Sequence, residues 1–139
     1  MPSASTDTAP NSVNLLGVDR RYQKLEGFTV SFESFHNDID TVHMFRGLPG
    51  DACQSPHWGV VQRGRVLFRF GDHEEVVDAG RAYYARPGHT ALIDAGTELI
   101  QFSPNGPLAE ALNVSVQTLG AALSDPDGIA GEPAEERAA

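Results

Sequence analysis

Hydrophobic and polar residues alternate along most of the chain between residues 28 and 102. In residues 28–33, Phe28, Val30 and Phe32 alternate with polar side chains, which predicts a strand that buries its apolar face. Turn-forming residues interrupt the alternation about every eight to twelve residues. We expect strands at residues 28–33, 40–45, 57–61, 65–70, 74–78, 82–85, 89–94 and 98–102. Short strands at this spacing predict an all-β sandwich or barrel rather than a parallel α/β sheet.

The strength of the pattern differs between segments. Residues 65–70 alternate regularly, and the Gly71-Asp72 pair that follows them predicts a hairpin into residues 74–78. Residues 15–24 mix polar and apolar side chains without a clear period. That segment fits either a short helix or an edge strand.

The two ends of the chain differ from its middle. Residues 1–12 are rich in Ser, Thr, Ala and Pro, and residues 124–139 are rich in Asp, Glu, Pro, Gly and Ala. Neither has an apolar period, so we predict two disordered tails around one domain at residues 13–123. Near the end of that domain the period becomes helical, which predicts an amphipathic helix over residues 107–123, against the barrel or a partner subunit. Its apolar stripe comprises Leu108, Leu112, Val116, Leu119 and Leu123.

Charge and composition exclude several classes of partner. The formal net charge of -9 argues against nucleic acid and against anionic membrane surfaces. No apolar run approaches the ~20 residues that cross a bilayer, and the first residues lack the pattern of a signal peptide. A single cysteine cannot form an internal disulfide. We therefore expect a cytoplasmic protein.

Residues 50–64 contain the chemically most informative side chains. This stretch holds the only cysteine, Cys53, the only tryptophan, Trp58, and His57 four residues after the cysteine. A thiol and an imidazole this close can be two ligands of one metal ion. A single cysteine in a β-protein is otherwise commonly a small buried hydrophobe. A nucleophilic Cys–His pair would also need an oxyanion site, which these two residues do not supply.

Three stretches of sequence resemble a known family. Residues 53–59 read C-Q-S-P-H-W-G, residues 83–89 read Y-Y-A-R-P-G-H, and residues 95–104 read A-G-T-E-L-I-Q-F-S-P. With the rhythm of turns and strands over residues 40–103, they resemble small single-domain bacterial cupins. The resemblance implies a double-stranded β-helix, or jelly-roll, barrel with the predicted C-terminal helix attached.

The first cupin metal motif places three residues of this chain at ligand positions. When the last glycine of that motif is aligned with Gly64, its glutamate position falls on His57. Its second histidine position falls on Cys53, and its first falls on Asp51.

The second cupin motif matches Gly88 and places its usual ligand histidine at Ala91. His89 stands two residues earlier. Residues two apart in a strand face the same side, about 6.8 Å apart, so we expect His89 to line the same cavity, nearer one mouth.

The ligand set implied by the resemblance is Cys53, His57 and His89. One thiolate with two imidazoles favours zinc, with iron or copper as alternatives. Three protein ligands with an open position are typical of a catalytic site. Asp51 is a candidate fourth ligand or an acceptor for an imidazole N–H.

Other side chains are weaker candidates. Only one of Tyr83 and Tyr84 can face inward, where its hydroxyl could act as an acid or base or orient a ligand, although an aromatic wall is the simpler role. Glu98 is a candidate base if its strand turns it inward, and a solvated carboxylate otherwise. Trp58 is expected in core or interface packing. The expected core lining comprises Phe68, Phe70 and Phe102, and the expected structural or surface histidines are His36, His43 and His73.

These observations lead to two main hypotheses about function, beside a purely structural or protein-interaction role suggested by the acidic tail and the C-terminal helix. The first is a metal-dependent cupin enzyme that acts on a small organic molecule, as an isomerase, cyclase or lyase, or as an oxygenase if the metal is iron. The alternative is a non-catalytic small-molecule binding or sensing module. The family resemblance, and the sheet edges that such a barrel must cover, also predict a homodimer.

Overall fold

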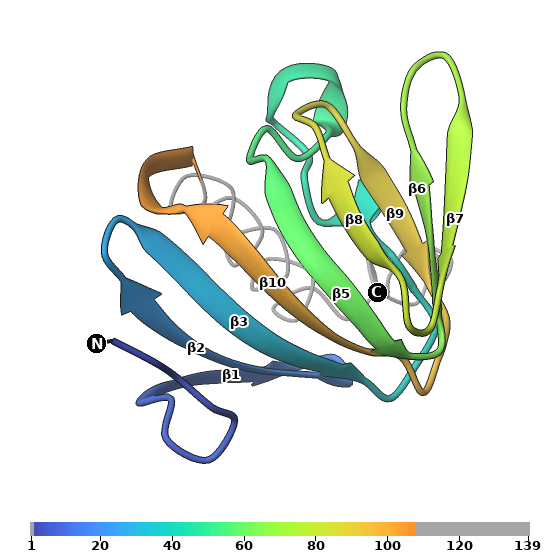
Figure 1. Cartoon of the computed structure of the whole chain (residues 1–139). Helices are drawn as coiled ribbons and strands as arrows, with labels where there is room; N and C mark the ends of the chain where they lie inside the picture. Colours follow the sequence, from blue (N-terminus) through green and yellow to red (C-terminus); the bar gives the residue numbers. More distant parts are fainter. Residues whose placement is uncertain (1, 108–139) are drawn as a thin grey trace.

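The computed structural model describes residues 2–107 of the 139-residue chain (Figure 1). The backbone is helical at residues 105–107. The rest of the helix predicted for residues 107–123 and the tail predicted for residues 124–139 lie outside the described residues. Within them, no helix has the length and apolar character needed to cross a membrane.

The described strands form two antiparallel sheets that face each other (Figure 1). The six-stranded sheet has the order β1-β2-β3-β10-β5-β8, and the four-stranded sheet has the order β4-β9-β6-β7. The strands of the first sheet are β1 (Asn11–Leu15), β2 (Val18–Leu25), β3 (Phe28–Phe35), β10 (Glu98–Pro104), β5 (His57–Arg63) and β8 (Ala82–Ala85). Those of the second are β4 (Ile39–Asp40), β9 (Thr90–Ile93), β6 (Arg65–Arg69) and β7 (Glu74–Asp78), and two short 3₁₀ turns, η1 (Thr41–His43) and η2 (Pro49–Asp51), precede β5. The all-β prediction is confirmed.

The main apolar core lies between the two sheets. Val61 and Leu99 of the six-stranded sheet are buried together with Val66 and Phe68 of the four-stranded sheet. Strands β7 and β8 coincide with the predicted segments 74–78 and 82–85. At the predicted hairpin, the Phe70 N–H donates to the His73 carbonyl at 2.8 Å. Val66 and Phe68, which the alternation of β6 predicts on its apolar face, are both buried.

The ambiguous segment 15–24 becomes a strand because of its partners. β2 pairs with β3 along its whole length and with β1 on its other side. The hydrogen bonds of these two ladders satisfy the backbone N–H and C=O groups of β2, so this segment forms a strand rather than a helix. The N-terminal residues reach the same strand, because the Arg21 guanidinium donates to the Thr6 carbonyl at 3.1 Å. Strand β1 begins at Asn11, just before the boundary that the sequence suggests at residue 12.

The strand predicted for residues 40–45 was wrong. β4 ends at Asp40, and η1 begins at Thr41. The Asp40 carboxylate accepts a hydrogen bond from the Val42 N–H at 3.1 Å, so its side chain caps the 3₁₀ turn instead of continuing the strand. The same carboxylate pairs with the Arg69 guanidinium of β6.

The structure differs most from the sequence-based expectation in which face of β3 points into the barrel. The polar residues of β3 point into the barrel, where Glu33 lines the internal cavity. Phe28, predicted to be buried, is 41% exposed, and Phe102 of β10, predicted to line the core, is 42% exposed. Trp58 lies on the same outer face, with its ring centroid 6.1 Å from that of Phe28 and 4.9 Å from that of Tyr84. Around Glu33 the six-stranded sheet thus has polar residues on its inner face and aromatic residues on its outer face, whereas Val61 and Leu99 of the same sheet belong to the apolar core.

The outer apolar face is partly covered by the start of the chain. Pro2, Ser3 and Ala4 line a groove together with Phe32 and Ile100 of that face. The groove encloses about 740 Å³. The predicted homodimer stays a prediction.

The turn between β5 and β6 connects the two sheets and requires glycine. Gly64 has a φ of +78°, and a Cβ at this position would lie 2.6 Å from the Cα of buried Thr97. The Thr97 hydroxyl in turn accepts from the Arg65 N–H at 3.1 Å. Both the left-handed backbone and the contact with Thr97 exclude a side chain.

We expect Gly64→Ala to destabilise the fold by about 2–4 kcal/mol, because it combines backbone strain with overpacking. The measurement is the midpoint and slope of urea unfolding. Gly71→Ala is the control, since a Cβ at Gly71 has no neighbour within 4 Å. Equal midpoints for the two variants would contradict this account of the turn.

Candidate metal site

Two segments that are distant in sequence meet at Cys53. It forms an isolated antiparallel bridge with His89, which precedes β9. The Cys53 N–H donates to the His89 carbonyl, and the Gly88 N–H donates to the Cys53 carbonyl, each at 2.8 Å. These two hydrogen bonds fix the thiol and the His89 ring beside each other.

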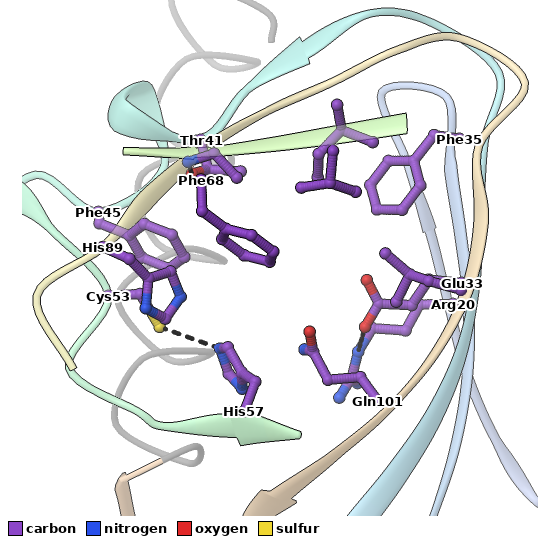
Figure 2. A pocket seen from close by; sticks show the side chains of 14 residues that line it. Arg20, Glu33, Phe35, Thr41, Phe45, Cys53, His57, Phe68, His89 and Gln101 are labelled. Atoms are coloured by element: carbon purple, nitrogen blue, oxygen red, sulfur yellow. Dashed lines mark hydrogen bonds and ion pairs between the residues drawn. The ribbon is translucent and has the colours of Figure 1, made fainter. Parts of the chain in front are cut away.

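His57 reaches the same place from the first position of β5 (Figure 2). Its Nε2 lies 3.4 Å from the Cys53 Sγ. The rings of His57 and His89 have centroids 5.0 Å apart. One donor atom from each of the three residues lies within 4.8 Å of the others, and all three side chains are buried. The structure brings together the three metal-ligand candidates that the sequence singled out.

The hydrogen bonds behind the rings orient their free nitrogens. His89 Nδ1 lies 2.7 Å from the Arg86 carbonyl oxygen. A carbonyl can only accept, so Nδ1 carries the proton and Nε2 keeps its lone pair. His57 Nδ1 lies 2.7 Å from the Ser103 hydroxyl. With Nδ1 donating to that oxygen, His57 Nε2 directs its lone pair toward Cys53. This arrangement is typical of histidines that bind metals.

Burial keeps all three groups in their neutral forms. It lowers the pKa of His57 to about 3, and unfavourable electrostatic interactions of a protonated ring with His89 and Arg20 act in the same direction. Burial also lowers the pKa of His89, although the hydrogen bond to the Arg86 carbonyl opposes this shift. The pKa of Cys53 rises to about 11, mainly through burial; the hydrogen bond to the Ser55 backbone opposes this rise and the charge of Glu33 adds to it.

Neutral imidazoles are the form that binds a metal, and the thiol would lose its proton to one. The donor set therefore fits a soft or borderline divalent ion. At neutral pH the protein has two unprotonated ring nitrogens directed at one position and a thiol that a bound cation can deprotonate. Such a site would release a proton on binding metal.

A cavity of about 120 Å³ opens beside these residues. Figure 2 shows Cys53, His57 and His89 on one side of it and Arg20, Glu33 and Gln101 on the other. The remaining walls are mostly apolar: Phe35, Thr41, Phe45, Val66, Phe68, Ala91, Ile93 and Leu99. His89 and Ala91 line the same cavity, as the strand period predicts.

The polar side of the cavity is a connected set of side chains. Arg20 Nε pairs with Glu33 Oε2 at 3.2 Å. The same carboxylate oxygen accepts from the Ser31 hydroxyl at 2.7 Å. The Tyr83 hydroxyl donates to Gln101 Oε1 at 2.5 Å. Burial, and after it the charge of Glu33, raises the pKa of Tyr83, so this hydroxyl remains a donor.

Gly59 makes the Tyr83–Gln101 contact feasible. It lies between the two residues in the sheet, paired with Tyr83 on β8 and with Gln101 on β10. A Cβ at Gly59 would lie 2.6 Å from the Tyr83 hydroxyl. The Tyr83 ring therefore crosses over the glycine to reach Gln101.

The sequence matches no protein-family model and no curated protein. An RmlC-like cupin from Shewanella frigidimarina NCIMB 400 is similar in structure, with a TM-score of 0.52 at 13% identity over 74% of this chain and 90% of that one. This chain has a small cupin fold. Pac13 of Streptomyces, a nucleoside dehydratase, has a TM-score of 0.53 at 15% identity over 75% of this chain and 82% of its own. FeII HppE has a TM-score of 0.53 at 10% identity, over 74% of this chain and 60% of its own.

Two of the weaker sequence candidates lie away from the cavity. Asp51 lies in η2, outside the group of three donor residues, and its carboxylate accepts from the Gly47 N–H of its own loop at 3.1 Å. Glu98 is nearly half exposed and lies 3.9 Å from Arg63 on the outside of the sheet. Tyr83 is the inward-facing tyrosine, and its hydroxyl holds Gln101.

Sequence reasoning missed five groups that support the site. They are Arg20, Glu33, Ser103, Gln101 and the carbonyl of Arg86. Ser103 and Gln101 lie within the family-like stretch 95–104, on the same face of β10 as Leu99. A polar face flanked by aromatic residues on β3 was the available signal for Glu33. The alternation alone predicts the opposite, apolar face of this strand as the buried one.

The pKa shifts predict how stability depends on pH. Both rings have lowered pKa values in the folded state, so on acidification the unfolded chain takes up their protons first. The contribution of His57 is therefore complete above pH about 6.5 and is lost as pH falls toward 3, and the contribution of His89 is lost in the same direction. For His57 we expect chelator-treated protein to lose up to about 1.4 kcal/mol per pH unit in this window.

The measurement is urea unfolding at pH 7 and pH 5 for wild type and for His57→Gln/His89→Gln. The variant should lose less stability between the two pH values. A similar loss in both proteins would show that these rings do not titrate as their burial predicts.

Proposed function

We propose that Cys53, His57 and His89 bind a divalent transition-metal ion and that this cupin is a metal-dependent enzyme for a small organic substrate. The observation that carries the proposal is the set of three buried donor atoms within 4.8 Å of one another. Zinc is the first candidate, because one thiolate and two imidazoles suit it well, and iron or copper are the alternatives. FeII HppE and the nucleoside dehydratase Pac13 show that this fold accommodates iron and dehydration chemistry in other proteins.

Three protein ligands leave room for a substrate atom or water at the ion. When bound, such an ion supplies Lewis-acid chemistry at a carbonyl or hydroxyl oxygen. The protein contributes the rest. The Arg86 carbonyl and Ser103 orient the ligand rings, and the apolar wall around Phe68 excludes water from the reacting groups. Isomerase, cyclase and lyase reactions fit this arrangement, and oxygenation fits it with iron.

A non-catalytic binding or sensing role is the second candidate. Among the described residues that line the cavity, Glu33 is the one carboxylate, and Arg20 and Ser31 hold it. The carboxylate in this part of the cavity is therefore already engaged by two other side chains. Chelator-sensitive turnover of a small substrate would favour the enzyme, whereas stabilisation by a ligand without turnover would favour the binding module.

We expect one equivalent of metal in protein purified without an affinity tag. Cys53→Ala, His57→Gln and His89→Gln should each weaken metal binding by more than the roughly 10–100-fold cost of losing an outer hydrogen-bond partner. Ser103→Ala should stay within that 10–100-fold range, because it removes only the partner of the His57 ring. Elemental analysis and competition with a chelator measure both effects.

His73→Gln is the matched control, since His73 is an exposed histidine that pairs with Asp72 and Glu75 and does not line the cavity. It should bind metal as wild type does. Metal content that is unchanged in Cys53→Ala, or that is negligible in the wild type, would sink the proposal.

A further inference from the structure

One polar atom in the cavity wall has no partner. Arg20 Nη1 is buried and, among the described residues, it is the buried side-chain nitrogen or oxygen atom without a hydrogen bond. The Arg20 side chain is 9% exposed and lines the cavity opposite the metal-ligand residues (Figure 2). A buried charged donor without an acceptor is costly. Because Arg20 lines the cavity, a ligand bound there could supply the missing acceptor.

The guanidinium is held in position by its other contacts. Nε pairs with Glu33 Oε2 at 3.2 Å, and the guanidinium carbon lies 4.4 Å from the centre of the Tyr22 ring. The Ser31 hydroxyl donates to the same carboxylate oxygen at 2.7 Å and so helps to fix it. Glu33 therefore neutralises the charge of Arg20 without occupying Nη1, and Nη1 stays available to a further oxygen.

A second donor lies between Arg20 and the metal-ligand residues. Gln101 Oε1 accepts the Tyr83 hydroxyl at 2.5 Å, which leaves the Gln101 amide nitrogen as a donor. Figure 2 shows this amide pointing toward the middle of the cavity. Arg20 and Gln101 together present two N–H donors to one region, a pattern that matches the two oxygens of a carboxylate.

We propose that the Arg20–Gln101 side of the cavity binds the carboxylate of a small organic acid, with the rest of the acid directed toward Cys53, His57 and His89. The orientation toward those residues rests on the proposed function, whereas the carboxylate site rests on Arg20 and Gln101 alone. A volume of about 120 Å³ limits the ligand to roughly ten non-hydrogen atoms. A phosphate dianion fits less well, because it carries more charge beside Glu33 and needs more donors than these two.

The test measures binding of lactate and of lactamide, its neutral isostere, by calorimetry and by thermal melting. We expect lactate, and not lactamide, to bind and to raise the melting temperature. Arg20→Gln/Glu33→Gln removes the ion pair as a unit and should weaken lactate binding roughly 10–100-fold. The matched control is Arg65→Gln/Asp94→Asn, an exposed pair with the same 3.2 Å separation, which should bind lactate as wild type does.

Glu33→Gln keeps the proposal testable if the double variant does not fold. It leaves Arg20 without its carboxylate, so the protein should melt at a lower temperature and regain more stability from lactate than wild type does. Equal binding of lactate and lactamide, unchanged affinity in the double variant, or binding of inorganic phosphate but not lactate would each overturn the carboxylate site.

Both titrations are run on chelator-treated and zinc-loaded protein. Lactate binding to chelator-treated protein that fails to bind zinc would support the carboxylate site and refute the metal proposal. Zinc binding without a preference for lactate over lactamide would support the metal proposal and refute the carboxylate site.

Discussion

The backbone bridge between Cys53 and His89 is the constraint on which the site depends. Its two hydrogen bonds join the loop before β5 to the residues before β9, and these strands belong to different sheets. The thiol and one imidazole are thereby fixed by main-chain geometry, independently of any ion. His57 then needs only the start of β5 and its contact with Ser103 to complete the group. Preorganisation of this kind lowers the ordering cost of binding a metal or a ligand.

The polar interior of the six-stranded sheet follows from the same site. Arg20, Glu33 and Gln101 occupy space inside the barrel that apolar side chains would otherwise fill. The apolar core therefore lies mainly between β5, β6, β9 and β10. The ion pair and the Tyr83–Gln101 hydrogen bond limit the cost of burying these groups. The apolar residues of the alternation then lie outside, where Phe28, Trp58 and Tyr84 form an exposed aromatic row. Exposed apolar surface of this kind commonly marks an interface.

The sequence predicted a segment correctly where residues close to it in the chain determine its structure. The hairpin at Gly71-Asp72 and the strands at residues 74–78 and 82–85 follow from turn chemistry and alternation. Residues 40–45 failed because one side chain, Asp40, caps a turn and pairs with Arg69 across the barrel. Asp51 was drawn into the ligand set by its motif position, but its carboxylate is bound by its own loop.

The sequence by itself predicted an all-β cupin fold, with Cys53, His57 and His89 as metal-ligand candidates through its resemblance to the family. Strand period, turn residues and motif spacing are local properties of the chain, so they can be read in order. Only the tertiary structure decided which face of each strand points inward, because alternation separates two faces without saying which one meets the other sheet. For the same reason it alone showed Arg20, Glu33 and Gln101 in the cavity. They come from three strands, and sheet pairing brings them together.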